Sequence, residues 1–260
     1  MDINGKCIVL TGTASGIGKS LLEHLLQYNV KVIAVDKEEQ PWLFSHPKVI
    51  PYQCDISKKK NIDMLFEFAV NKLGVVDIFI GNAGFGYYEK IVIEDWERIE
   101  KIFHTNVFAS IYAAEKMYAL NKDRRYMIAF TASTMVEFPI PGYALYAATK
   151  CALDGFIRTY RYEMGNKGKI LMIYPISTKT QFFQTAGNTR PLEWPLQTPD
   201  KVAKAIIKGI QREKACIYPS KIYSLGKIIS AVIPLVPKLY MKREIMKLEK
   251  WHKSSLHPYN

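Results

Sequence analysis

The sequence predicts an α/β fold with a doubly wound parallel sheet of about seven strands. Short apolar runs alternate with segments of helical periodicity along most of the 260 residues, as in consecutive βαβ units. Several runs consist almost only of Val, Ile and Leu, which is typical of strands that helices cover on both faces. No Pro-, Gly- or Ser-rich linker divides the chain, so we expect one α/β domain over residues 1–220.

The elements can be placed in chain order. The expected strands lie at residues 6–10, 30–35, 48–53, 76–80, 125–130, 169–173 and 215–218. The expected helices lie at residues 16–28, 57–73, 95–120, 143–165 and 199–212. The last helix has the clearest beginning, because Thr198 suits the N-cap and Pro199 suits the first helical position. We expect residues 221–260 to form an apolar and basic helical extension, either within the same domain or as a lid or interface element.

The composition excludes several classes of protein. Hydrophobic residues make up 48% and charged residues 23%, an ordinary balance for a soluble domain. The cysteines and histidines are scattered and form no Cys-x-x-Cys pair, so we expect neither a metal site nor a disulfide framework. No signal peptide is visible, and we therefore expect a cytoplasmic protein.

The net charge of +12 is concentrated toward the end of the chain. Residues 221–260 carry eight Lys or Arg residues against two Glu residues. Because no nucleic-acid-binding motif accompanies this charge, we expect no nucleic-acid partner.

A glycine-rich turn joins the first strand to the first helix. Gly12 permits the sharp exit from the strand, Gly16 lets the backbone approach a pyrophosphate, and Gly18 allows the helix to pack closely on the sheet. The helix N-terminus then presents free N–H groups and a positive dipole end to the phosphates. This strand–turn–helix context predicts a Rossmann-type dinucleotide site that begins with Gly12, Ser15, Gly16, Ile17 and Gly18.

The second strand ends at Asp36, twenty residues after Gly16. A carboxylate at this place accepts hydrogen bonds from the adenosine ribose and repels a 2′-phosphate, which favours NAD over NADP. The neighbouring Lys37 could offset that repulsion, so NADP stays an alternative.

Two further segments lie at the carboxyl ends of expected strands, where open α/β sheets bind ligands. Asp55 and Ile56 follow the third strand, and Asn82, Ala83 and Gly84 follow the fourth. We expect both segments to contact the cofactor, although Asp55 could alternatively cap the following helix.

A tyrosine and a lysine lie four residues apart on an expected helix. Tyr146 and Lys150 therefore project from the same face. An ammonium beside a phenol favours the phenolate and lowers the tyrosine pKa, which suits acid–base chemistry near neutral pH. Ser133 stands thirteen residues upstream of the tyrosine, at the end of the fifth strand, and Asn106 lies in the helix before that strand.

With the glycine-rich turn, these residues resemble the short-chain dehydrogenase/reductase family in its single-domain form. The resemblance covers about residues 5–220. It implies an NAD(P)-dependent oxidoreductase that interconverts a secondary alcohol and a ketone. It also implies a homodimer or homotetramer, since the helices at 95–120 and 143–165 are the usual interface in the family.

The resemblance implies a role for each matching residue. Tyr146 exchanges a proton with the substrate oxygen, and Lys150 lowers the tyrosine pKa and binds the nicotinamide ribose. Ser133 orients the substrate oxygen, and Asn106 holds a water that relays protons between Lys150 and solvent. The implied cofactor contacts are Asp36 at the adenosine ribose, Asp55 and Ile56 at adenine, and Asn82, Ala83 and Gly84 along the cofactor. Ser133 could instead be a strand-end cap, and Asn106 a helix-kink residue.

The sequence departs from the family pattern at two places. Gly81 stands where the family often has Asn, and Pro175 is followed by Ile176 where the family has Gly. The second change removes backbone freedom beside the nicotinamide and could reshape the substrate entrance. Thr180 stands where the family places a threonine that contacts the carboxamide. Neither change removes a catalytic group.

The substrate is expected to be an apolar or bulky alcohol or ketone. The segment 178–196 should form the substrate loop, and the loop after Ser133 should face it. The apolar residues of these two loops are Phe182, Phe183, Leu192 and Trp194, with Phe138 and Tyr143 opposite. Some of these side chains could simply pack the loops.

The segment 224–253 mixes apolar and basic residues. Its apolar stretch is too short to span a bilayer. It could pack on a partner subunit, cover the substrate pocket, contact an anionic membrane surface, or form a solvated end.

The sequence is compatible with three functions. The first is the NAD(P)-dependent oxidoreductase, the second a catalytically silent NAD(H)-binding regulator, and the third a membrane-surface protein, including a reductase of a lipid-like substrate. The complete set of Asn106, Ser133, Tyr146 and Lys150 favours the first, because a sensor needs no proton donor.

Overall fold

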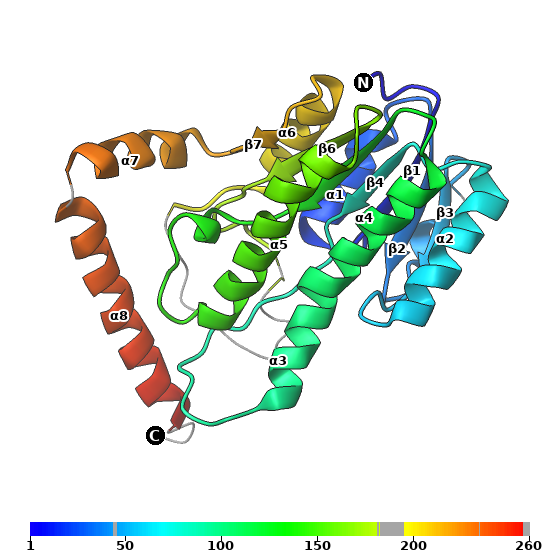
Figure 1. Cartoon of the computed structure of the whole chain (residues 1–260). Coiled ribbons are helices and arrows are strands. Elements are labelled where there is room, and N and C mark those ends of the chain that lie inside the picture. Colours follow the sequence, from blue (N-terminus) through cyan, green and yellow to red (C-terminus); the bar gives the residue numbers. More distant parts are fainter. Residues whose placement is uncertain (44–45, 181, 183–194, 234, 257–260) are drawn as a thin grey trace.

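The core of the protein is one parallel sheet of seven strands in the order β3-β2-β1-β4-β5-β6-β7 (Figure 1). The computed structural model describes residues 1–43, 46–180, 182, 195–233 and 235–256. The strands are β1 Lys6–Thr11, β2 Val30–Asp36, β3 Val49–Gln53, β4 Ile78–Gly81, β5 Tyr126–Thr131, β6 Gly168–Ile173 and β7 Cys216–Ile217. The order reverses between β1 and β4, which places a ligand-binding switch point at their carboxyl ends.

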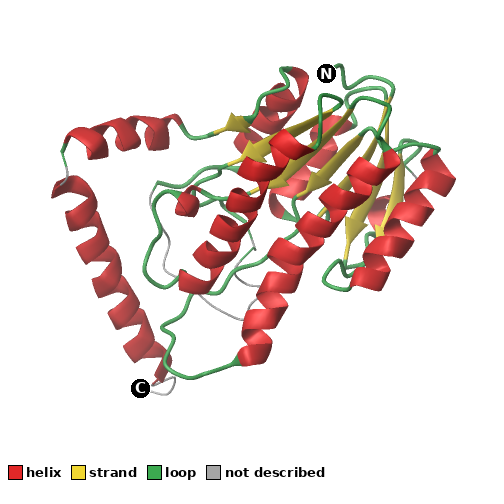
Figure 2. Cartoon of the chain, in the orientation of Figure 1, coloured by secondary structure: helices red, strands yellow, loops and turns green. Residues whose placement is uncertain are grey.

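Helices cover both faces of the sheet (Figure 2). One face carries α1 Gly16–Leu25 and α6 Pro199–Gln211, which pack on each other. The other carries α2 Lys59–Leu73, α4 Ala109–Leu120 and α5 Ala144–Glu163. The doubly wound fold is thus confirmed.

Alternation along the strands divides the core into two halves. In β1, Ile8 packs with the α1 and α6 side and Val9 with the α2, α4 and α5 side, and both are buried. Because both faces are covered, successive positions are apolar, which explains why the strands appear as continuous hydrophobic runs. All seven expected strands are present, each within two residues of its expected bounds.

The expected helix at 95–120 is interrupted. The structure has α3 Trp96–Phe103, a π-helical turn His104–Phe108, and then α4. A π-turn widens the backbone by one residue and is often found at functional sites. By contrast, the expected start of α6 is confirmed, because the Thr198 side chain accepts a hydrogen bond from Lys201 N–H and Pro199 occupies the first turn.

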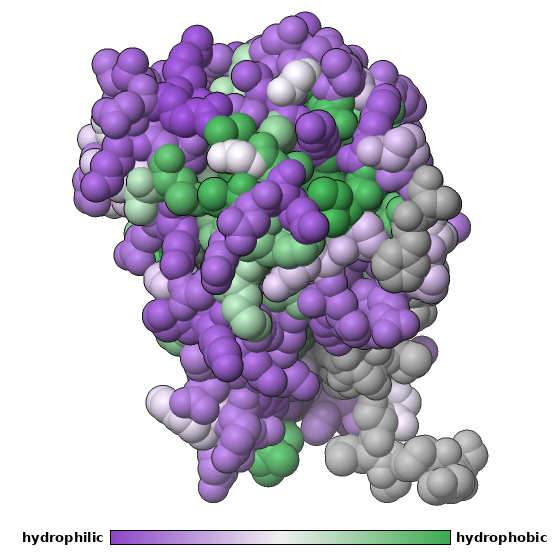
Figure 3. All heavy atoms as spheres, turned by 90° about the vertical axis from the view of Figure 1, so that its right-hand side faces the viewer, coloured by the Kyte–Doolittle hydropathy of each residue, from purple (hydrophilic) through white to green (hydrophobic). Residues whose placement is uncertain are grey.

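Two helices continue the chain after β7. Helix α7, Lys221–Val232, leads away from the sheet edge, and α8, Leu235–Leu256, turns back toward the loops that follow β4 and β5 (Figure 1). Within the described residues, neither helix is long and apolar enough to cross a membrane. The side of the molecule at β3 and α2, far from these helices, shows a band of hydrophobic residues surrounded by hydrophilic ones (Figure 3).

Candidate active site

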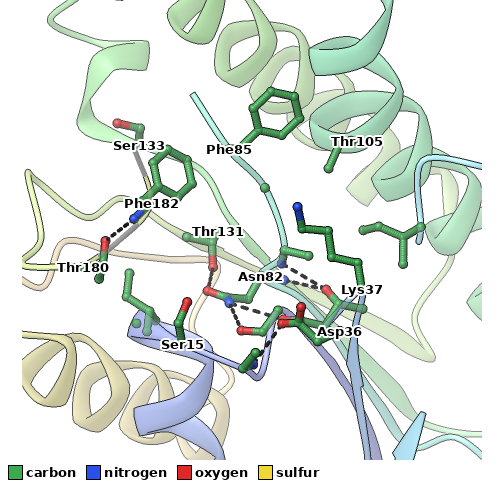
Figure 4. A pocket seen from close by; sticks show the side chains of 18 of the residues that line it. Ser15, Asp36, Lys37, Asn82, Phe85, Thr105, Thr131, Ser133, Thr180 and Phe182 are labelled. Carbon is green, nitrogen blue, oxygen red and sulfur yellow. Dashed lines mark hydrogen bonds between the residues drawn. The ribbon is translucent and has the colours of Figure 1, made fainter. Parts of the chain in front are cut away.

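A cavity with about 780 Å³ of space opens at the carboxyl ends of the strands. The glycine-rich turn, the segments after β2, β4 and β5, and the start of α5 line it. Figure 4 shows Ser15 and Asp36 on the side of the turn, with Ser133 and Phe182 on the other side. The expected site residues that line it are Gly12, Ser15, Gly16, Ile17, Asp36, Asp55, Ile56, Asn82, Ala83, Gly84, Ser133, Tyr146, Lys150, Pro175 and Thr180.

The glycines of the turn are needed for its geometry. Gly12 has a φ of +75°, and a Cβ there would lie 2.9 Å from the Cα of Ala83. Gly18 does not line the cavity, but a Cβ on it would overlap the carbonyl oxygen of Gly12. Gly18 therefore lets α1 start directly against the turn, as its expected packing role requires.

The start of α1 leaves backbone donors for a ligand. Ser15 is the N-cap residue, yet its side chain makes no capping hydrogen bond. The first N–H groups of a helix have no partner within the helix, and their positive end attracts anions. Thr180 lies beside this turn, since its Cγ2 is 2.9 Å from the place that a Gly16 Cβ would occupy.

Asp36 lies at the cavity beside Lys37. Its Oδ2 accepts a hydrogen bond from Ala14 N–H at 2.9 Å, and its Oδ1 accepts one from Glu38 N–H at 3.1 Å. These bonds fix the carboxylate but use only part of its capacity, because each oxygen can accept more than one donor.

Asp55 does not cap α2. Its Oδ1 accepts a hydrogen bond from Ser57 N–H at 3.0 Å, whereas the N-cap residue of α2 is Lys58. The alternative role as a helix cap is therefore wrong. Asp55 and Ile56 both line the cavity.

A threonine network, which the sequence did not indicate, fixes the segment after β4. The Thr11 hydroxyl oxygen accepts hydrogen bonds from Asn82 N–H and Ala83 N–H, both at 3.1 Å. Asn82 Nδ2 donates to the carbonyl oxygens of Thr11 and Gly12, and its Oδ1 accepts from the Thr131 hydroxyl at 3.2 Å. Asn82 thereby links the ends of β1, β4 and β5. The one available signal was that both threonines end apolar strands.

Tyr146 and Lys150 are both buried on α5 and line the cavity. The Lys150 ammonium lies 5.6 Å from the centre of the Tyr146 ring and donates to the Thr131 carbonyl oxygen at 2.8 Å. Burial lowers the pKa of Lys150 to about 8, because removal from water disfavours the charged form. The predicted helical pair is thus placed on one face and held in position from β5.

Ser133 follows β5 and is buried at the cavity wall. Its Oγ accepts a hydrogen bond from Met135 N–H at 3.2 Å and caps the short 3₁₀ turn Thr134–Val136. Ser133 therefore caps the turn that follows β5, and because the bond is accepted, the hydroxyl hydrogen is left for another acceptor.

Asn106 is buried in the π-turn and does not line the cavity. Its Nδ2 donates to the Phe85 carbonyl oxygen at 2.8 Å and to the Thr149 hydroxyl at 3.1 Å, and its Oδ1 accepts from Phe85 N–H at 3.1 Å. Its side chain thus fixes the loop after β4 and contacts α5. Thr149, which no sequence motif marks, donates in turn to the Tyr146 carbonyl oxygen at 2.7 Å.

The model of the family described as short chain dehydrogenase matches residues 6–191 of the chain. The chain belongs to this family. It is an NAD(P)-dependent oxidoreductase. A 3-ketodihydrosphingosine reductase of Dictyostelium discoideum is 30% identical over 243 residues, which cover 80% of this chain and 73% of that protein.

Two solved structures have a similar fold. A short chain dehydrogenase/reductase from Burkholderia phymatum, in complex with NAD, has a TM-score of 0.77 at 18% identity and covers 87% of this chain and 92% of its own. A short chain dehydrogenase from Burkholderia cenocepacia J2315, in complex with NADP, has a TM-score of 0.76 at 19% identity and covers 93% of this chain and 99% of its own.

In this short-chain dehydrogenase, the departures from the family pattern are accommodated locally. The ring of Phe130 packs so closely on Gly81 that a Cβ there would lie 2.6 Å or less from the ring. The Pro175 carbonyl oxygen accepts hydrogen bonds from the N–H and the hydroxyl of Thr134. Ile176 lines the cavity beside it.

Apolar side chains line the cavity around Tyr146. The lining residues that pack in one cluster with Tyr146 are Phe85, Tyr87, Met135 and Phe182, and Ile176 lines the cavity as well. The Phe182 ring stands edge-on to the Tyr146 ring, with the centroids 5.6 Å apart. Phe138 and Tyr143 do not line the cavity, because they pack on Tyr240 and Tyr88. Phe183, Leu192 and Trp194 lie outside the described residues.

Proposed function

We propose that this enzyme transfers a hydride between a nicotinamide cofactor and an apolar or bulky substrate, interconverting a secondary alcohol and a ketone. The observation that carries the proposal is that Tyr146, Lys150 and Ser133 line the same cavity as the glycine-rich turn. The two halves of the reaction, cofactor and substrate, therefore have adjoining places in one site.

The residues on the turn side fit a dinucleotide. The uncapped start of α1 after Ser15 offers N–H donors to a pyrophosphate, and Asp36 suits the adenosine ribose. Asp55 and Ile56 would lie at adenine, and the segment after β4 would line the cofactor with Pro175 and Thr180 opposite. When bound, the nicotinamide supplies or accepts the hydride.

Tyr146 moves the proton in this proposal. Its hydroxyl gives a proton to the carbonyl oxygen during reduction and takes one from the alcohol during oxidation. The Lys150 ammonium, buried beside the ring, favours the phenolate and would bind the nicotinamide ribose. Ser133 donates its remaining hydrogen to the substrate oxygen, because its Oγ already accepts from Met135 N–H.

We assign Asn106 to the proton path behind Lys150. Asn106 Oδ1 lies 3.0 Å from the place that a Gly84 Cβ would occupy, and Lys150 Nζ lies 3.7 Å from the same point. The two polar groups thus approach each other behind Gly84, where a water held by Asn106 would connect the ammonium to solvent.

We favour NAD over NADP as the cofactor. The Asp36 carboxylate, fixed by two backbone N–H groups at the cavity, would repel a 2′-phosphate. Lys37 lines the same part of the cavity and would attract one, so the preference depends on the balance of these two side chains.

The apolar lining around Tyr146 supports a substrate with a hydrophobic group next to its carbonyl. Phe85, Met135 and Phe182 would contact that group. The name of the Dictyostelium relative, 3-ketodihydrosphingosine reductase, denotes the reduction of a ketone, which agrees with a ketone as the substrate of this enzyme.

A panel of ketones and alcohols, offered with NAD(H) and NADP(H), tests the proposal. We expect Tyr146→Phe to lower kcat/KM by about a hundredfold or more while NADH binding is kept. Tyr162→Phe is the matched control, since Tyr162 is exposed on the same helix. Near-normal turnover by Tyr146→Phe would refute the catalytic assignment. Tight NADH binding without turnover of any compound would instead indicate a cofactor-binding regulator.

We also propose that the enzyme self-associates as a dimer or tetramer through α4 and α5. Phe108, Tyr118 and Leu120 are exposed along the π-turn and α4, which suits a buried interface between copies. Sedimentation at several concentrations measures the state, and Leu120→Glu should shift it toward the monomer. A monomer at all concentrations would refute this assembly.

A further inference from the structure

The outer face of α7 is apolar and uncovered. Ile222, Leu225 and Ile229 recur at the i, i+3, i+7 spacing of one helix face, and all three are exposed. The inner face is held by Tyr223, whose hydroxyl donates to Glu137 at 2.9 Å. An apolar face fixed outward in this way marks an interaction surface.

The outer face of α8 is also apolar and exposed. Leu235, Leu239 and Met246 are exposed, at the i, i+4, i+11 positions of the helix. The inner face is fixed to the body, because Glu249 pairs with Lys90 at 2.7 Å and Trp251 packs on Tyr88 with ring centroids 5.0 Å apart. We call the outer faces of α7 and α8 together the C-terminal face.

The charge on the C-terminal face is positive and largely unpaired. Both glutamates of residues 221–260 are engaged by lysines, Glu244 by Lys247 and Glu249 by Lys90. In the part of the chain that the structure describes, the basic residues here without an ion pair are Lys221, Lys238, Lys242, Arg243, Lys250 and Lys253. A partner must therefore accept both apolar side chains and positive charge.

The positive charge of the C-terminal face distinguishes between two possible partners, a second copy of the chain and a lipid bilayer. A second copy of the chain would bring like charges together, and the cores of protein–protein interfaces are depleted in Lys. A bilayer with anionic phospholipid satisfies both requirements, because Ile and Leu enter the acyl boundary while ammonium groups contact phosphates. Neither described helix can cross a bilayer, so both would lie along its surface.

We propose that the C-terminal face docks the enzyme on a membrane surface that contains anionic phospholipid. The inner side of α8 lies against the cluster that includes Tyr88, Tyr143 and Tyr146. A docked molecule would therefore hold its substrate side close to the membrane and could take an apolar substrate from it. This last consequence rests on the proposed function, whereas docking itself does not.

Vesicle co-sedimentation of the full chain tests the docking. We expect binding to vesicles of phosphatidylcholine with phosphatidylglycerol, and weak binding to phosphatidylcholine alone. The triple variant Lys238→Glu, Lys242→Glu, Arg243→Glu should weaken partitioning by about a hundredfold. Leu225→Ser with Ile229→Ser should weaken it as well. In the matched control, Lys58, Lys60 and Lys72 are replaced by Glu. These lysines are exposed on and before α2, and their replacement changes the net charge by the same amount.

Three results of the vesicle assay would overturn the proposal. They are absence of binding to anionic vesicles, equal loss in the control and the basic variant, and unchanged binding of the apolar variant. A concentration-dependent dimer that the apolar variant abolishes, without vesicle binding, would make the C-terminal face a contact between copies and would also refute docking. Circular dichroism melts verify that each variant is folded. Tyr146→Phe should bind vesicles like the natural chain, so failure of docking and failure of the catalytic proposal are separable.

Discussion

The side-chain amide of Asn106 donates a 3.1 Å hydrogen bond to the hydroxyl of Thr149. The same hydroxyl donates at 2.7 Å to the Tyr146 carbonyl oxygen. Thr149 therefore connects the π-turn to the first turn of α5. Because Asn106 is bound on its other side to the backbone of Phe85, the loop after β4 and the proposed proton donor share one buried network.

We predict that Thr149→Val lowers kcat more than it raises KM, because Tyr146 loses a fixed backbone position. Loss of the hydroxyl also leaves the Asn106 amide with fewer partners, which should lower the free energy of unfolding by ~1–3 kcal/mol. Steady-state kinetics and denaturant melts measure both effects. Thr149→Ser should restore kcat, and Thr159→Val, an exposed threonine of the same helix, should change neither quantity. A KM effect alone would contradict the positioning role.

Burial of Lys150 makes the stability of the ligand-free enzyme depend on pH. Its pKa of about 8 lies below the ordinary 10.5, so the unfolded chain binds more protons between these values. Stability relative to Lys150→Met should therefore rise with pH across this window, by at most ~1.4 kcal/mol per pH unit. Below pH 8 the difference should be constant. Denaturant melts at a series of pH values measure it, with the exposed Lys167→Met as control. A flat difference across the window would show that Lys150 is not desolvated.

The strands were predictable because burial on both faces leaves long apolar runs. The observed strand ends differ from the expected ones where a polar side chain makes hydrogen bonds or ion pairs with a distant part of the chain. The fourth strand begins at Ile78 rather than at residue 76, because Asp77 accepts a hydrogen bond from Cys7 N–H and pairs with Arg124. These two interactions of Asp77 involve partners 47 and 70 residues away along the chain, which local sequence patterns do not reveal.

The site was predictable in its motifs and less so in its supports. The turn glycines and the tyrosine–lysine pair have fixed spacings, so a sequence displays them. Thr11, Thr131 and Thr149 act through single hydroxyl or carbonyl groups, and a threonine at a strand end or in a helix has no distinctive pattern. The π-turn was missed for the same reason, since its apolar periodicity resembles that of an α-helix.

Cofactor preference should respond to two adjacent residues in opposite directions. Asp36→Asn keeps an acceptor for Ala14 N–H but removes the negative charge, so NADPH should bind about tenfold more tightly relative to NADH. Lys37→Ala should weaken the binding of NADPH relative to NADH, because it removes the positive charge that would attract a 2′-phosphate. Fluorescence titration with both cofactors measures the two ratios. Glu39→Gln is the control, because Glu39 is exposed and does not line the cavity. Equal ratios in all variants would place the adenosine ribose elsewhere.

Glu137 joins the loop after Ser133 to the C-terminal helices. Its carboxylate accepts hydrogen bonds from Tyr218 at 2.6 Å and Tyr223 at 2.9 Å, and it pairs with Lys227 at 2.8 Å. Burial acts to raise the Glu137 pKa, but these donors outweigh it and hold the pKa below its usual range.

We expect Glu137→Gln to loosen α7, because charged hydrogen bonds become neutral ones, with a loss of ~1–3 kcal/mol. The folded pKa is lowered, so this stabilisation is complete above the ordinary pKa near 4.5 and is lost as pH falls through the folded value. Limited proteolysis at lysines of α7, with melts at neutral and acid pH, measures the effect. The exposed Glu163→Gln is the matched control. If Glu137→Gln leaves cleavage of α7 and neutral stability at control levels, α7 is held by its remaining contacts and not by this carboxylate.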